Sequence, residues 1–247
     1  MDFFKQSFDR ESLLAGQIFL IHKPLGWTSF QVVNKIRHFL KKQTGLKKLK
    51  VGHAGTLDPL ATGLLILCTG KMTKTISALQ EEEKEYTGTF YLGATTPSYD
   101  LETEQNQQFS ISHLSPQKIY DTTNQFKGKI KQLPPLYSAL KKEGKRLYEY
   151  ARQGLSPELN ARNVYISKFE IQNIDLPQIS FLVRCSKGTY IRSLAHDFGK
   201  ALNSGAHLSS LCRTKIGKFA LEEAYTMESV YDETSLKNIS LKKNDIK

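Results

Sequence analysis

The segment from Gly52 to Gly63 holds the densest set of residue types that could carry out chemistry. It contains His53 and Asp58 among three glycines and one proline. Glycine and proline give a loop an irregular but defined backbone, and such loops often present a reactive side chain from a rigid scaffold. An isolated aspartate in a loop of this composition is also typical of a turn or a helix cap. The residues alone therefore leave both roles open for Asp58.

Several other chemistries are excluded by motifs that the chain lacks. There is no G-x-x-x-x-G-K-[ST] or G-x-G-x-x-G segment for a nucleotide phosphate, and no G-x-S-x-G nucleophile elbow. Cys68, Cys185 and Cys212 are far apart and never form a C-x-x-C pair. Neither a zinc site nor a disulfide framework is therefore expected.

The positive charge is concentrated in two stretches. Lys35–Lys50 holds seven basic residues and no acidic one, and Lys127–Arg152 holds eight basic and two acidic residues, in a chain of formal net charge +11. The second stretch also carries Tyr137, Tyr148 and Tyr150. One charge run alone usually forms a solvated face, but two separated runs, the second interleaved with tyrosines, favour a polyanion with stackable bases.

The elements that must position these residues are predicted from apolar periodicity. Thr28-Ser29 can cap a helix whose apolar positions recur through Leu40, and 52–63 is expected to be a structured loop. Further helices are expected over residues 72–83 and 190–202, and strands over 17–22, 64–68, 86–92, 163–175, 179–185 and 208–219. Residues 94–125 are polar and weakly patterned. Strands and helices mix without strict alternation, which favours an α+β fold.

Length and composition agree with a soluble protein. The chain has 247 residues, of which 39% are hydrophobic and 24% charged. The longest apolar run is Leu64–Cys68, far below the roughly 20 residues of a membrane helix. The N-terminus does not resemble a secretory signal, so we expect a cytoplasmic protein.

Six segments resemble a known family. Gly52–Gly63, with the sequence GHAGTLDPLATG, resembles the catalytic motif of the TruB-type tRNA pseudouridine synthases. Five further segments resemble motifs of that family in its order: Lys23–Ser29, Lys84–Tyr86, Pro134–Lys141, Cys185–Arg192 and Gly205–Arg213. The resemblance covers about residues 17–220.

The resemblance implies both a fold and an activity. The fold would be α+β, with a mixed, mainly antiparallel sheet, flanking helices and an inserted thumb. The activity would be isomerisation of uridine 55 in the T-loop of tRNA, in which the N1–C1′ bond breaks and the uracil rejoins through C5. No metal or organic cofactor is implied. The implied partner is the T-arm stem-loop of tRNA, bound by a monomer with no obligate protein partner and no membrane.

The family motifs assign roles to single residues. Asp58 matches the nucleophile, which attacks either C1′ of the ribose or C6 of the base, and Arg192 matches the arginine that pairs with it. Tyr86 matches a tyrosine that stacks on the base, Tyr190 a second tyrosine that contacts it, and Leu211 an apolar wall of the uracil pocket.

Two further residues are expected at the substrate. His53 matches a histidine that replaces the extruded base in the stack, and Lys23 belongs to the turn motif. His22 stands where the family has an aspartate. The target uridine must be flipped out before it can react.

The resemblance also implies a domain organisation. Residues 1–16 form an N-terminal extension, 17–225 the catalytic domain, and 226–247 a segment with a lysine-rich tail and no PUA domain. The thumb covers about 132–162, and its cations are expected to contact RNA phosphates: Lys141, Lys142, Lys145 and Arg146.

Two other functions stay open at this point. The chain could be an RNA-binding or tRNA-folding protein without catalysis, or a synthase that acts on another RNA. A pure RNA-binding protein has no need of Asp58 or Arg192, so both residues favour the enzyme.

Overall fold

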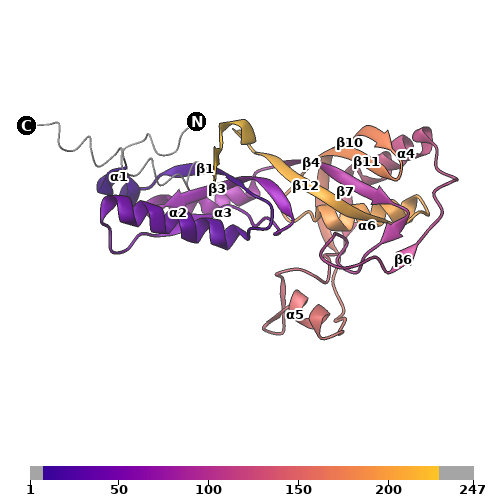
Figure 1. Ribbon diagram of the computed structural model, residues 1–247, viewed down its shortest axis with the longest axis horizontal. Helices are drawn as coiled ribbons and strands as arrows, with labels where there is room; N and C mark the ends of the chain where they lie inside the picture. Colours follow the sequence, from indigo (N-terminus) through magenta and orange to yellow (C-terminus); the bar gives the residue numbers. More distant parts are fainter. Residues whose placement is uncertain (1–7, 228–247) are drawn as a thin grey trace, which may run out of the picture. The chain divides into compact units, whose positions relative to one another are not determined.

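The computed structural model describes residues 8–227 and divides into two compact units (Figure 1). Unit 1 comprises Met1–Glu82 and Arg213–Lys247, and unit 2 comprises Glu83–Cys212. The second boundary falls within strand β12 (Ala206–Ile216). Among residues 8–227, no helix is long and apolar enough to cross a membrane.

Unit 1 is built around strand β3 (Ala61–Thr69), which pairs antiparallel with β1 (Ile18–Lys23) and β2 (Val51–His53). Alternate residues of β3 point to opposite faces, and both faces are buried. The remaining elements of unit 1 are α1 (Arg10–Ala15), α2 (Ser29–Thr44), the 3-10 helix η2 (Gly70–Thr75), α3 (Ile76–Glu81), β13 (Phe219–Ala220), the 3-10 helix η4 (Leu221–Glu223) and β14 (Tyr225–Thr226), which pairs parallel with β1.

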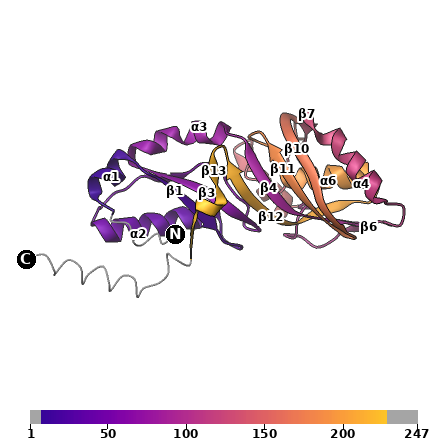
Figure 2. The same ribbon diagram turned by 90° about the horizontal axis from the view of Figure 1, so that it is seen from above.

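Helix α2 begins where the sequence predicts it. Thr28 caps the helix by accepting from the backbone N–H of Gln31, whose side chain in turn accepts from the backbone N–H of Thr28. This reciprocal capping box satisfies two backbone donors at the helix start. Gly45, at φ +69°, ends the helix in the left-handed conformation. Figure 2 shows α2 and α3 on opposite faces of β1 and β3, so each helix covers one of the two cores of unit 1.

Unit 2 contains an antiparallel sheet in the order β4–β11–β10–β7, with the first part of β12 beside β4. Its strands are β4 (Lys84–Leu92), β5 (Ala94–Thr95), β6 (Gln107–Gln108), β7 (Gly128–Gln132), β8 (Lys141–Lys142), β9 (Lys145–Arg146), β10 (Arg162–Asp175) and β11 (Gln178–Cys185). Its helices are α4 (Pro116–Thr122), the 3-10 helix η3 (Thr123–Phe126), α5 (Leu147–Arg152) and α6 (Ile191–Ala201).

Helix α6 is held to this sheet by an aromatic core. Phe198 of α6 lies 5.2 Å from Phe169 of β10 between ring centroids, and Phe90 stacks on Phe181 at 4.1 Å. Such pairs contribute about 0.5–1.5 kcal/mol each beyond the apolar area that they bury. The core fixes the start of α6, where Tyr190 and Arg192 lie.

The α+β class and the mainly antiparallel pairing are confirmed, as are the helices at 30–40 and 190–202 and five of the six predicted strands. The strand predicted over 208–219 is divided, because β12 ends at Ile216 and Phe219 begins β13 after a turn. The loop over 52–63 was predicted too long, because β2 ends at His53 and β3 begins at Ala61. The helix over 72–83 is divided between η2 and α3, and 94–125 contains α4, capped by Ser115. The lysine-rich tail lies outside the described residues.

Candidate active site

Asp58 lies on a loop whose two ends are paired in the sheet of unit 1. Before the loop, the Ala54 N–H donates to the Ile66 carbonyl at 2.9 Å; after it, the Ala61 N–H donates to the Asp58 carbonyl at 3.0 Å. Gly63 has φ +108°, and a Cβ atom there would lie 2.4 Å from the backbone of Arg213. Only glycine fits this position, because the neighbouring backbone occupies the space of a side chain. The half-buried Asp58 side chain is thus presented from a closely determined backbone.

Helix α2 clamps the middle of the same loop. The Ser29 hydroxyl accepts from the Leu57 N–H at 2.9 Å and donates to the Leu57 carbonyl at 3.2 Å. The Gly26 N–H donates to the Pro59 carbonyl at 2.9 Å. Asp58 therefore lies between Leu57, which the start of α2 binds, and Pro59, which the turn before α2 binds.

Two buried cations stand in this part of unit 1. Lys23 is fully buried, and its amine donates to the carbonyls of Trp27 at 2.6 Å, Pro24 at 3.1 Å and Pro59 at 3.4 Å. Arg213 is 1% exposed and donates to the carbonyls of Leu64 at 2.8 Å and Gly55 at 3.1 Å. Both cations tie the loop to its surroundings, because each bridges backbone carbonyls from separate segments.

The pKa of the Lys23 amine is lowered to about 8: burial lowers it most, attraction to the Asp58 carboxylate partly opposes that shift, and repulsion from the Arg213 guanidinium makes a smaller contribution to the lowering. Lys23 is thus charged at pH 7 and loses its charge as the pH rises through about 8. Burial also lowers the pKa of His53, so its imidazole is neutral at pH 7. Its Nδ1 atom is buried without a hydrogen-bond partner among the described residues.

Arg192 is buried in unit 2, where it forms an ion pair that the sequence did not indicate. Its Nε lies 3.6 Å from Oδ2 of Asp100, and the two side chains are 4% and 7% exposed. Its Nη1 donates to the carbonyls of Tyr137 at 2.9 Å and Ser98 at 3.2 Å. The pairing of Arg192 with Asp58 stays a prediction.

Asp100 was missed because it lies in the weakly patterned stretch after β4. The local hydrogen bonds define its position: its carboxylate accepts from the Glu102 N–H at 2.9 Å, and its carbonyl accepts from Thr96 at 2.7 Å and Ser98 at 3.2 Å. Tyr99, at φ +65°, makes the turn that precedes it. Clustered serine, threonine and aspartate residues indicate a turn of this kind, but they do not indicate that Asp100 pairs with Arg192.

Three other predicted site residues also lie in unit 2. Tyr86 on β4 and Leu211 on β12 are partly buried, and both pack against the core of unit 2. Tyr190 precedes α6, and the Gln132 side chain bonds both its N–H, at 2.8 Å, and its carbonyl, at 3.1 Å. The Arg162 guanidinium lies 5.7 Å from the centroid of the Tyr190 ring.

The predicted thumb contains a small hairpin that carries the four cations assigned to RNA. Strands β8 and β9 pair, with Lys141 opposite Arg146 and Lys142 opposite Lys145. Glu143 and Gly144 connect them with φ +51° and +84°, as two-residue hairpin loops require. Three of the cations are exposed, while the amine of the half-buried Lys142 donates to the Glu158 carbonyl at 2.6 Å.

Unit 1 therefore holds Lys23, His53 and Asp58, and unit 2 holds the other predicted residues. Arg213 and Ser29 lie in segments that resemble family motifs, but the sequence assigned no role to either; both form hydrogen bonds that fix the Asp58 loop. Within residues 8–227, no group of three His, Cys, Asp or Glu side chains could hold a metal ion.

Comparison with known proteins assigns these residues to a family. The model for the N-terminal domain of TruB family pseudouridylate synthases matches residues 41–191, which is more than half of the chain. The chain belongs to this TruB family. Its members are isomerases, and a second model, for the tRNA pseudouridylate synthase B C-terminal domain, matches residues 192–243.

Curated TruB relatives resemble most of the chain. A protein of Flavobacterium johnsoniae named tRNA pseudouridine synthase B is 61% identical over 87% of this chain and 94% of its own length. A protein of Phocaeicola vulgatus with the same name is 51% identical over 87% and 91% of the two chains.

A solved structure extends the comparison to the fold. A chain in the crystal structure of a Cbf5-Nop10-Gar1 complex superimposes with a TM-score of 0.67 and 29% identity. The superposition covers 92% of this chain and 57% of that one. The predicted pseudouridine synthase fold is thereby confirmed.

Proposed function

We propose that this TruB family member converts uridine 55 in the T-loop of tRNA to pseudouridine, with Asp58 as the nucleophile. The main observation in support of this proposal is that Asp58 lies in the middle of a loop to which Ser29, Lys23 and Arg213 form hydrogen bonds. The names of the relatives support tRNA as the substrate, and the catalytic motif resembles that of synthases acting at uridine 55.

The chemistry requires an ionised carboxylate and a uracil that can rotate. Asp58 attacks C1′ of the ribose or C6 of the base, and the N1–C1′ bond breaks. The uracil turns and C5 bonds to C1′. The bond between Asp58 and C1′ or C6 breaks and returns the free carboxylate, the hydrogen on C5 leaves as a proton, and N1 gains a proton. The reaction is an isomerisation and needs no oxidant. Below a pH of about 8, Lys23 is charged and is attracted to the Asp58 carboxylate.

Two tyrosines and a leucine are the proposed contacts to the base. Tyr86 stacks on the uracil, Tyr190 contacts it and Leu211 closes an apolar wall. Stacking is sequence-tolerant and contributes about 1–3 kcal/mol per base, which offsets the few kcal/mol needed to flip a nucleotide. The ion pair with Asp100 positions the Arg192 guanidinium.

The reaction is tested on two RNAs with the purified chain: intact tRNA and an isolated T-arm stem-loop. We expect pseudouridine at position 55 in both. The proposed site residues lie between Lys23 and Arg213, so kcat/KM should agree within about tenfold, or about 1.4 kcal/mol of transition-state binding. Nucleotide mapping and initial rates measure this. Modification at another position contradicts the site assignment, and a thousandfold preference for whole tRNA shows that further contacts are required.

The thumb hairpin is tested by salt dependence. Replacing Lys141, Lys142, Lys145 and Arg146 together with alanine should flatten the plot of log K for tRNA binding against log salt. Each phosphate contact contributes roughly 0.7–0.9 to the slope, so losing four lowers it by about 3. Titrations between low and physiological salt measure the slope. An unchanged slope would mean that the hairpin is a solvated face.

A further inference from the structure

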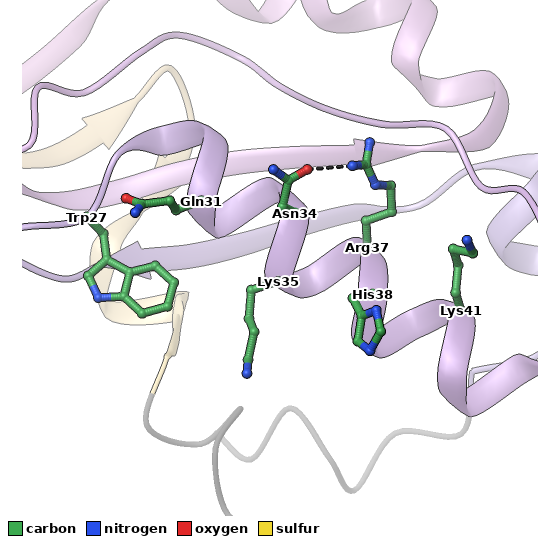
Figure 3. Close-up of a pocket in the computed structure, with 7 residues that line it drawn as sticks. All are labelled: Trp27, Gln31, Asn34, Lys35, Arg37, His38 and Lys41. Carbon is green, nitrogen blue, oxygen red and sulfur yellow. Dashed lines mark hydrogen bonds between the residues drawn. The ribbon is translucent and has the colours of Figure 1, made fainter.

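A basic groove runs along the outer face of α2, apart from the thumb hairpin. Figure 3 shows Trp27 at one end and Lys41 at the other, with Lys35 and Arg37 between them. The groove measures about 580 Å³ and opens widely. Gln31, Asn34, Lys35, His38 and Lys41 recur at intervals of three or four, so they share one side of α2, away from the face that packs on the core. Arg37 extends from the other edge of this side, in the direction opposite to Lys35 (Figure 3).

The charge of this groove has a single sign. The chain contains no acidic residue between Glu11 and Asp58. Outside its buried face, α2 carries four Lys or Arg residues and one histidine. The Arg37 guanidinium donates to the Asn34 side-chain carbonyl one turn earlier, which orients it on the helix. An oriented guanidinium is suited to bidentate contact with a phosphate.

The groove begins at the catalytic loop. Ser29 at the start of α2 contacts Leu57, and the carbonyl of Trp27 shares the Lys23 amine with that of Pro59. From Ser29 to Lys41 the helix extends by about 18 Å, at 1.5 Å per residue. At roughly 3.4 Å per nucleotide along one strand of a duplex, that distance corresponds to about five nucleotide steps.

We propose that this groove, lined by Trp27, Lys35, Arg37 and Lys41, binds the sugar-phosphate backbone of the RNA that flanks the target uridine. This inference rests on the proposed function for the identity of the RNA. The three cations neutralise successive phosphates, and the indole of Trp27 offers a ring on which a base can stack. A membrane surface fits less well, since the groove has one aromatic ring and no broad apolar side.

Trp27 is the single tryptophan of the chain and therefore an intrinsic probe of the groove. Adding tRNA to the full chain carrying Asp58→Asn should change the tryptophan fluorescence in a saturable way. The triple variant Lys35→Ala, Arg37→Ala, Lys41→Ala in that background should lower the salt slope of tRNA binding by about 2, at 0.7–0.9 per contact. It should also weaken the fluorescence change at a given tRNA concentration.

A matched triple variant controls for net charge. Lys71, Lys74 and Lys218 are exposed cations of unit 1 that lie outside the groove, and Lys71 and Lys74 belong to η2, beside the other core. Replacing these three with alanine removes the same charge and should change the slope by less than about 1. Circular dichroism checks that both variants are folded.

Three outcomes would overturn the proposal: equal slope changes in the two triple variants, a tRNA titration that leaves Trp27 fluorescence unchanged, or a response to anionic phosphatidylglycerol vesicles without one to tRNA. The readout is binding, so it is separate from the reaction. If wild-type chain forms no pseudouridine while the groove variant still loses tRNA binding selectively, the proposed function fails and the groove stands. If pseudouridine forms and the two variants bind alike, only the groove fails.

Discussion

Asp58→Asn is expected to abolish isomerisation while RNA binding stays within a few-fold of wild type. Asparagine has nearly the shape of aspartate, so the Asp58 loop and its contacts with Ser29 and Gly26 should persist. An amide, however, is not a nucleophile toward C1′ or C6. The loss therefore falls on the chemical step and not on substrate binding.

Tritium release from 5-labelled uridine in a T-arm stem-loop measures this effect. Asp175→Asn is the matched control, because Asp175 is an exposed carboxylate at the end of β10, and it should retain wild-type activity. Residual turnover of Asp58→Asn above about one hundredth of wild type would contradict the assignment of the nucleophile. Loss of RNA binding together with turnover would instead indicate a disrupted loop.

The Arg192–Asp100 pair is expected to produce the largest stability effect among polar substitutions. Both side chains are more than nine-tenths buried, so removing one partner takes away the ion pair that offsets part of the cost of burying the other charge. We expect Asp100→Ala and Arg192→Met each to lower the free energy of unfolding by about 3–5 kcal/mol. Arg192→Met also leaves the carbonyls of Ser98 and Tyr137 without this donor.

A double-mutant cycle, measured by urea unfolding, separates the interaction free energy of the Arg192–Asp100 pair from the contributions of other contacts. The double variant should be less destabilised than the sum of the single variants, because the ion pair is already broken when the second partner is removed. Arg152 and Glu102 form a matched exposed pair, 3.8 Å apart with side chains 68% and 44% exposed, and their cycle should give less than about 1 kcal/mol. Strict additivity at Arg192 and Asp100 would show that the ion pair does not couple them.

Local sequence patterns were sufficient for much of the fold. Strand β4 was predicted from the alternation of Tyr86–Leu92, and the start of α2 from Thr28, because side-chain period and capping depend on neighbouring residues. The Asp58 loop was located from its glycines and its resemblance to a family motif, although its ends proved to be strands β2 and β3. Pairing between β2 and β3 extends these strands into the segment whose composition had indicated a loop.

The candidate residues could be named from the sequence alone, from the motif around Asp58, the apolar periods of the elements and the two basic stretches. The groups that hold those residues in place could be found only in the folded chain. Arg213 lies 158 residues from Gly55 along the chain and donates to its carbonyl, and Arg192 meets Asp100 across more than ninety residues. Such partners leave no local pattern, because a buried cation is satisfied by whichever carbonyl or carboxylate the fold brings within reach. Burial likewise lowered the pKa values of His53 and Lys23, since desolvation depends on the packed surroundings and not on neighbours in the sequence.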